Sequence, residues 1–224
     1  VTVETEAGVE TKLLDIDRDL LLIPNVAIHM NRQANEGYKW NPAVDTLPLI
    51  GSAGTAGKLP ALLEKEAGGK ILGHDLYLYI RQKASVWGVD GEYISAAALD
   101  DLECAFGCMK GFLAAKPSGS VPVCCVFDNE EVGSQTKQGA ASTMLSDVLH
   151  RINAACGRTE EEYRMAVAAS FLVSADNAHA MHPNHPEYAD SANCPQLGGG
   201  VVVKYNANQR YTTDAVSGAV FQAV

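Results

Sequence analysis

The sequence has few basic side chains and no long hydrophobic run. Its 224 residues include 17 Lys and Arg against 27 Asp and Glu, a formal net charge of −10 at pH 7. Because an acidic chain is repelled by phosphates and by anionic lipid, we expect neither nucleic acid nor a membrane as a partner. No apolar stretch reaches the roughly 18 residues that a membrane-spanning helix needs, so we expect no transmembrane segment.

The six cysteines include no C-x-x-C pair, which argues against a cysteine-ligated zinc site. Free cysteine is among the most buried residue types, so core packing in a reducing, cytoplasmic setting is the expected role. The first residues, Val1–Glu6, have neither the basic nor the apolar region of a secretion signal. The chain does not start with Met, from which we expect further residues before Val1.

Hydrophobic patterning divides the chain near residue 83. Residues 1–83 predict a smaller β-rich domain, because short apolar runs there are bounded by turn residues. In residues 84–224 strands alternate with helices, which indicates an α/β domain with a mixed or parallel sheet covered by helices. The strands expected are 13–17, 20–23, 26–30, 71–79, 92–96, 121–127, 165–173 and 201–203, and the helices expected are 59–67, 102–113, 144–152 and 214–224.

Acidic residues follow the most apolar of these strands. The run 121–127 leads directly into Asp128-Asn129-Glu130-Glu131-Val132-Gly133-Ser134. Ligands of open α/β sheets bind at the carboxyl ends of strands, and concentrated negative charge there calls for cations. Successive side chains of extended chain point opposite ways, so Glu130 and Glu131 should differ in role: one ligates a metal and the other takes a proton.

Two further acids occupy comparable positions. Asp100, Glu131 and Asp176 each follow a predicted strand, so the three carboxylates can converge on one centre. Oxygen ligands of this kind suit Zn, Mn or Co, and one carboxylate can bridge two ions. Each acid also has a structural explanation: a solvated acidic loop for Glu131, a capping box with Glu103 for Asp100, and a turn for Asp176.

The acidic segment resembles the signature of the aspartyl aminopeptidase family, which are dinuclear zinc exopeptidases. Four other segments match that family in the same order, and together they reach from end to end of the chain while covering about the middle half of a typical member. They are Ile28-His29-Met30, Leu99-Asp100-Asp101-Leu102, Ser174-Ala175-Asp176-Asn177-Ala178-His179-Ala180, and Arg210-Tyr211.

The resemblance implies a role for each matched residue. It implies Asp100 as the ligand that bridges two zinc ions, Glu131 and Asp176 as ligands of one ion each, and Glu130 as the general base. It also implies contacts of other side chains with the substrate or its surroundings: His29, which reaches a neighbouring subunit's active site, Lys204 and Tyr211. From its position three residues after Asp176, His179 is expected to orient a metal ligand or the substrate. The alternatives are a surface-loop histidine for His179 and an ordinary exposed lysine for Lys204. A lysine suits the acidic side chain of a substrate as a point charge.

The family also supplies two histidine ligands, and no histidine of this chain matches their positions. The chain therefore carries the acidic half of the expected site. Ala98 stands where many members have Arg before the Leu-Asp-Asp motif, which would weaken a preference for acidic substrates.

These features favour a metalloaminopeptidase that removes N-terminal residues from peptides and prefers Asp or Glu. We expect it to use two divalent ions, which are zinc or else Co or Mn. We also expect a homo-oligomer, because members of the family that it resembles form dodecamers. Three alternatives stay open: a family member of broader specificity, a non-catalytic assembly subunit or fragment without the histidine ligands, and a metal-free hydrolase that uses two carboxylates, such as a glycosidase.

Overall fold

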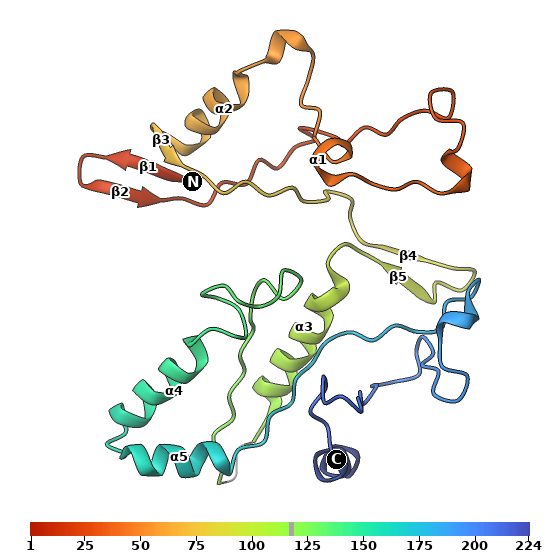
Figure 1. Cartoon of the computed structure of the whole chain (residues 1–224). Coiled ribbons are helices and arrows are strands. Elements are labelled where there is room, and N and C mark those ends of the chain that lie inside the picture. Colours follow the sequence, from red (N-terminus) through yellow and green to blue (C-terminus); the bar gives the residue numbers. More distant parts are fainter. Residues whose placement is uncertain (117–118) are drawn as a thin grey trace. The chain divides into compact units, whose positions relative to one another are not determined.

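The computed structural model describes residues 1–116 and 119–224, and the strands it forms there are short and antiparallel (Figure 1). The chain divides into two units, Val1–Ala97 and Ala98–Val224. The domain boundary expected after residue 83 stays a prediction.

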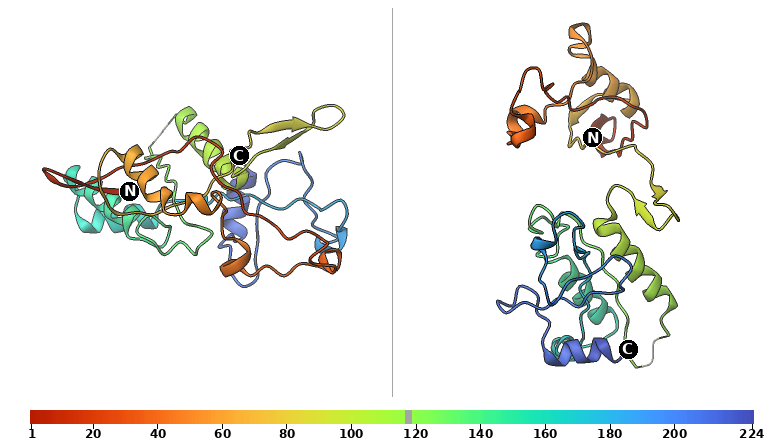
Figure 2. Two further views of the ribbon diagram at one scale, coloured as in Figure 1. Left: turned by 90° about the horizontal axis from the view of Figure 1, so that it is seen from above. Right: turned by 90° about the vertical axis from the view of Figure 1, so that its right-hand side faces the viewer.

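The first unit is built on a three-stranded sheet of order β2-β1-β3, in which β1 (Thr2–Thr5) pairs antiparallel with β2 (Gly8–Thr11) and β3 (Ile71–Gly73). Beside this sheet lies α2 (Lys58–Ala67), as Figures 1 and 2 show. The buried apolar side chains described in this unit are Val3, Leu63 and Ala67. The core of the unit therefore lies between the sheet and α2, where the central strand and one helix face supply its residues.

The sequence predicted α2 because its start and stop signals are local. Gly68 ends the helix with a left-handed φ of 70°, and its N–H bonds back to carbonyls of the last turn. The rest of the unit holds the hairpin of β4 (Ser85–Trp87) and β5 (Tyr93–Ser95), in which Trp87 stacks on Tyr93 at 4.6 Å. Three short helical turns complete it: η1 (Ala34–Glu36), α1 (Pro42–Asp45) and η2 (Ala53–Thr55).

Helices dominate the second unit. They are α3 (Leu99–Ala114), α4 (Met144–Ala155), α5 (Glu160–Ala168), the turn η3 (Pro186–Tyr188) and α6 (Ala215–Gln222). The positions of α3, α4 and α6 agree with the predicted ones, whereas α5 and η3 were not predicted. Thr159 begins α5 with a complete capping box to Glu162, and Asp214 begins α6 in the same way with Ser217. Between α5 and η3 the chain runs extended alongside the start of α3 (Figure 1).

Most of the predicted strands are wrong. Within the described part of the chain, residues 121–127 and 201–203 form neither a helix nor a strand, and residues 165–168 belong to α5. Residues 26–30 end in a turn, and residues 13–17 and 20–23 form no strand, although Leu22 makes one isolated bridge with Leu49. An apolar run becomes a strand only beside a partner strand, and the described residues offer these segments none.

Of the long segment expected at 71–79, only β3 pairs, whereas 93–95 of the segment expected at 92–96 form β5. None of the helices described is long and apolar enough to cross a membrane.

Candidate metal centre

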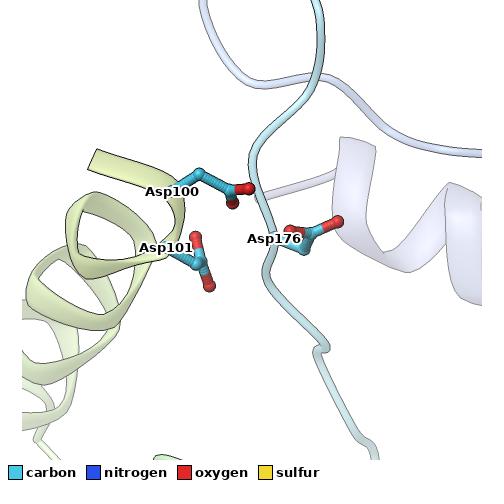
Figure 3. Close-up of side chains that lie close together, drawn as sticks. All are labelled: Asp100, Asp101 and Asp176. Carbon is cyan, nitrogen blue, oxygen red and sulfur yellow. The ribbon is translucent and has the colours of Figure 1, made fainter. Parts of the chain in front are cut away.

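One of the expected acids, Asp100, stands with its neighbour Asp101 at the distorted start of α3. The N-cap position belongs to Ala98, which has a left-handed φ of 58° and no side-chain cap. Asp100 and Asp101 have non-helical backbone angles, with ψ values of 109° and 33°. The explanation of Asp100 as a capping residue is therefore wrong, and both carboxylates stand clear of the helix towards Asp176 (Figure 3).

The carboxylates of Asp100, Asp101 and Asp176 form one group. One oxygen from each lies within 4.8 Å of the others, with Asp176 brought in by the extended segment that follows α5. Like charges about 5 Å apart repel by roughly 1 kcal/mol in water and by about 3–4 kcal/mol at an effective dielectric constant of 20. A nearby cation would stabilise a group of this kind.

Lys204 supplies part of that balance. Its Nζ donates hydrogen bonds to Asp176 Oδ2 at 2.7 Å and to the backbone oxygen of Asn177 at 2.8 Å. Partial burial acts to lower the pKa of Lys204, but the hydrogen bond and attraction of Asp176 outweigh it, so the pKa lies above its ordinary value. One ammonium against three carboxylates leaves the group with an excess of negative charge.

An unsatisfied oxygen also points to a cation. In residues 1–116 and 119–224, Asp101 Oδ1 is the buried side-chain polar atom without a hydrogen-bond partner. The nearby Cys104 thiol has a single hydrogen and donates it to Asn177 Oδ1 at 2.8 Å, so it is not free to serve Asp101. Burial and, next, the Asp101 carboxylate raise the pKa of Cys104 to about 12, so the thiol stays protonated. Three carboxylates with one buried, unpaired oxygen fit a divalent ion.

The two adjacent glutamates occupy a tight loop before α4. Gly133 N–H bonds to the Glu130 carbonyl at 2.8 Å, and Asn129, with φ 60°, accepts from Ser134 N–H through its own carbonyl. The side chains of Glu130 and Glu131 are not buried, and neither belongs to the three-aspartate group. Their assigned roles as base and ligand stay predictions.

The other expected site residues are placed as follows. Tyr211 lies near the group, because its ring centre is 5.5 Å from Lys204 Nζ, whereas His179 is exposed three residues beyond Asp176. His29 belongs to the first unit and occupies an exposed turn, where the N–H groups of Met30 and Asn31 bond to the Ala27 carbonyl.

Three residues that the structure places at this centre have no role in the site predicted from the sequence: Asp101, Cys104 and Asn177. Asp101 belongs to the Leu-Asp-Asp motif, and Asn177 directly follows a predicted ligand. Their closeness in sequence to predicted ligands was therefore the signal that could have identified them. Cys104 was assigned to core packing, and its spacing from Asp100, about one helical turn, was the only available hint.

Comparison with known proteins extends these findings. The whole chain, residues 1–224, matches the model of the family described as Aminopeptidase I zinc metalloprotease (M18). A relative in Clostridium acetobutylicum, named "Probable M18 family aminopeptidase 2", is 44% identical over 222 residues, which are 96% of this chain and 51% of that protein. The chain thus spans about half the length of the curated relatives it matches.

Two solved structures share the fold. Chaetomium thermophilum mApe1 is 28% identical with a TM-score of 0.81, covering 100% of this chain and 55% of that one. The S. cerevisiae mApe1 dodecamer is 22% identical with a TM-score of 0.74, covering 99% and 52%. The α/β class expected from the sequence is confirmed by this likeness, while the parallel sheet stays a prediction.

Proposed function

The chain belongs to the aminopeptidase I zinc metalloprotease family, and from that premise we propose that it contributes the acidic half of a two-metal site for cleaving N-terminal peptide bonds. The observation that supports this most is the convergence of Asp100, Asp101 and Asp176 within 4.8 Å. The group takes residues from two segments more than 70 positions apart, which neither a local turn nor a helix cap explains.

Carboxylates would hold the ions. In the proposal Asp100 would be a ligand shared by both ions, Asp176 would bind one and Glu131 the other, and histidines that this chain does not supply would complete the set. The chemistry that zinc, or Co or Mn in its place, would supply there is that of a Lewis acid for the scissile carbonyl and for the attacking water.

Glu130 is the proposed general base. It takes the proton of the attacking water and passes it to the leaving amine. The tight turn at Gly133 carries Glu130 and Glu131 on one short loop, so both can be delivered to the site together.

Lys204 and Tyr211 are the proposed contacts for an acidic substrate side chain. An ammonium has three donors, of which Asp176 and Asn177 occupy two, so one remains for a substrate carboxylate. This supports a preference for N-terminal Asp or Glu. His179 and His29 are proposed to line the substrate site, His29 from a neighbouring copy in a homo-oligomer. The S. cerevisiae mApe1 structure, which shares the fold, is a dodecamer, in keeping with such an assembly.

We also propose a cytoplasmic location, since the described cysteines, six in number, are all free thiols.

Metal dependence separates this proposal from a metal-free carboxylate hydrolase. In the full-length protein, hydrolysis of Asp-, Glu- and Leu-arylamides should stop after treatment with a chelator and return with Zn, Co or Mn. Activity that persists in the chelator would rule the proposal out, and cleavage of Leu-arylamide as fast as of Asp-arylamide would rule out the acidic preference alone.

A further inference from the structure

The side chain of Asn177 joins the two segments that carry the aspartate group. Its Oδ1 accepts the Cys104 thiol hydrogen at 2.8 Å, and its Nδ2 donates to the Leu99 carbonyl at 3.4 Å. Both partners belong to the first turns of α3, the helix that also carries Asp100 and Asp101. Asn177 directly follows Asp176, so its amide links the segment that contains Asp176 to the start of α3, which carries Asp100 and Asp101.

Little else fixes the backbone around Asp176. Among the described residues, no backbone–backbone hydrogen bond involves the N–H or C=O groups of residues 171–180, and the nearest such bonds are those of Ser170 and Met181. Lys204 also contacts this segment, because its Nζ donates hydrogen bonds to Asp176 Oδ2 and to the Asn177 carbonyl. Lys204 is not part of α3, so these bonds do not join the segment to that helix. Among the hydrogen bonds of the described residues, those of the Asn177 amide therefore join this segment to α3.

We propose that Asn177 is a positioning residue that holds Asp176 against Asp100 and Asp101, with the Cys104 thiol fixing the orientation of its amide. The amide fits this role because it offers a donor and an acceptor in one plane, and the Cys104 thiol donates to the acceptor. Without the amide, repulsion within the aspartate group moves Asp176 away, and the ligands are no longer set in advance for an ion. The inference rests on the proposed metal site.

Residues that orient metal ligands change metal affinity by about 10- to 100-fold when they are lost. In the metal-depleted full-length protein, titration with Co²⁺ should show a loss of affinity in that range for Asn177→Ala, together with a changed visible absorption spectrum of the bound Co²⁺. Cys104→Ser keeps a donor and should bind close to wild type, whereas Cys104→Ala should weaken binding in the direction of Asn177→Ala.

Asn153 provides a matched control. Its amide also joins two segments, donating to the Arg158 and Thr159 carbonyls between α4 and α5, far in sequence from the aspartates. Asn153→Ala should leave Co²⁺ affinity within about twofold of wild type, even where it lowers the thermal midpoint. If Asn177→Ala does not fold, the Cys104→Ser and Cys104→Ala pair provides the same comparison.

These measurements distinguish failure of the proposed metal site from failure of the positioning role of Asn177. Wild-type protein whose Co²⁺ binding does not depend on Asp176 would contradict the metal site itself. Binding that depends on Asp176 but is equally tight in Asn177→Ala, or equally tight in both Cys104 variants, would overturn the positioning role alone.

Discussion

Replacing Asp176 with Asn tests the electrostatics of the aspartate group, because the change removes one charge and keeps the shape of the side chain. Two opposing terms act on the metal-free protein. The change removes the repulsion of Asp176 with Asp100 and with Asp101 across at most 4.8 Å, and it removes the ion pair with Lys204 at 2.7 Å.

In water the two repulsions amount to about 1.7 kcal/mol and the lost attraction to about 1.5 kcal/mol. At an effective dielectric constant of 20 both terms grow about fourfold and still differ by less than about 1 kcal/mol. Since both side chains of the ion pair are partly exposed and screened by salt, the smaller values apply. The free energy of unfolding without metal should therefore change by no more than about 1 kcal/mol.

Metal binding should respond very differently. The amide introduced by Asp176→Asn offers a neutral oxygen where the ion requires a carboxylate, and the loss should exceed the roughly 100-fold that follows from removing an orienting partner. Urea unfolding in EDTA measures the first quantity, and calorimetric titration with Zn²⁺ measures the second. A variant that binds Zn²⁺ as tightly as wild type, or that loses several kcal/mol of metal-free stability, would refute the reasoning.

Three other expectations follow. Glu130→Gln should keep the metal content of the full-length protein and lower kcat by about 10²- to 10⁴-fold, measured beside metal analysis; unchanged turnover would remove Glu130 as the base. Thr159→Ala should cost about 1 kcal/mol of unfolding free energy in urea, because α5 loses its capping box, and no loss would show that the cap is not needed. The hydrogen bond from the Thr159 backbone and, next, that from Arg158 lower the pKa of Glu162 to about 2 from its ordinary value near 4.5. The ionised Glu162 therefore stabilises the fold above about pH 4.5, and this stabilisation disappears as the pH falls towards 2. Glu162→Gln should remove that part of the acid unfolding curve, and an identical curve in the variant would contradict the assignment.

Local sequence signals were sufficient to predict most of the helices. Apolar spacing together with Gly68 and Asp214 at helix ends marked α2 and α6, since helix ends depend on a few neighbouring residues. The helix α5 was missed, because residues 165–173 were assigned to a strand from their apolar character alone. Strands depend on partners elsewhere in the chain, and for this reason the apolar runs at 121–127 and 201–203 were assigned wrongly. The hairpin of β1 and β2 was missed because its turn, Glu6-Ala7, lacks the Asn-Gly or Asp-Gly signature.

The candidate site was also predictable only in part, because local motifs identify some of its residues and long-range contacts bring in the others. The motifs named Asp100, Asp176 and Lys204, which the structure places together, although the strand ends that were to bring them there do not form ladders. The contribution of Asp101 comes from the non-helical start of α3, and that of Asn177 from contacts across more than 70 positions, neither of which a local pattern reveals.

A crystal structure of the full-length protein with zinc, with anomalous scattering recorded at the zinc edge, tests the central assignment most directly. The account predicts anomalous peaks at about 2.0–2.2 Å from carboxylate oxygens of both Asp100 and Asp176. Zinc bound elsewhere, with both of these carboxylates free of it, would contradict the account.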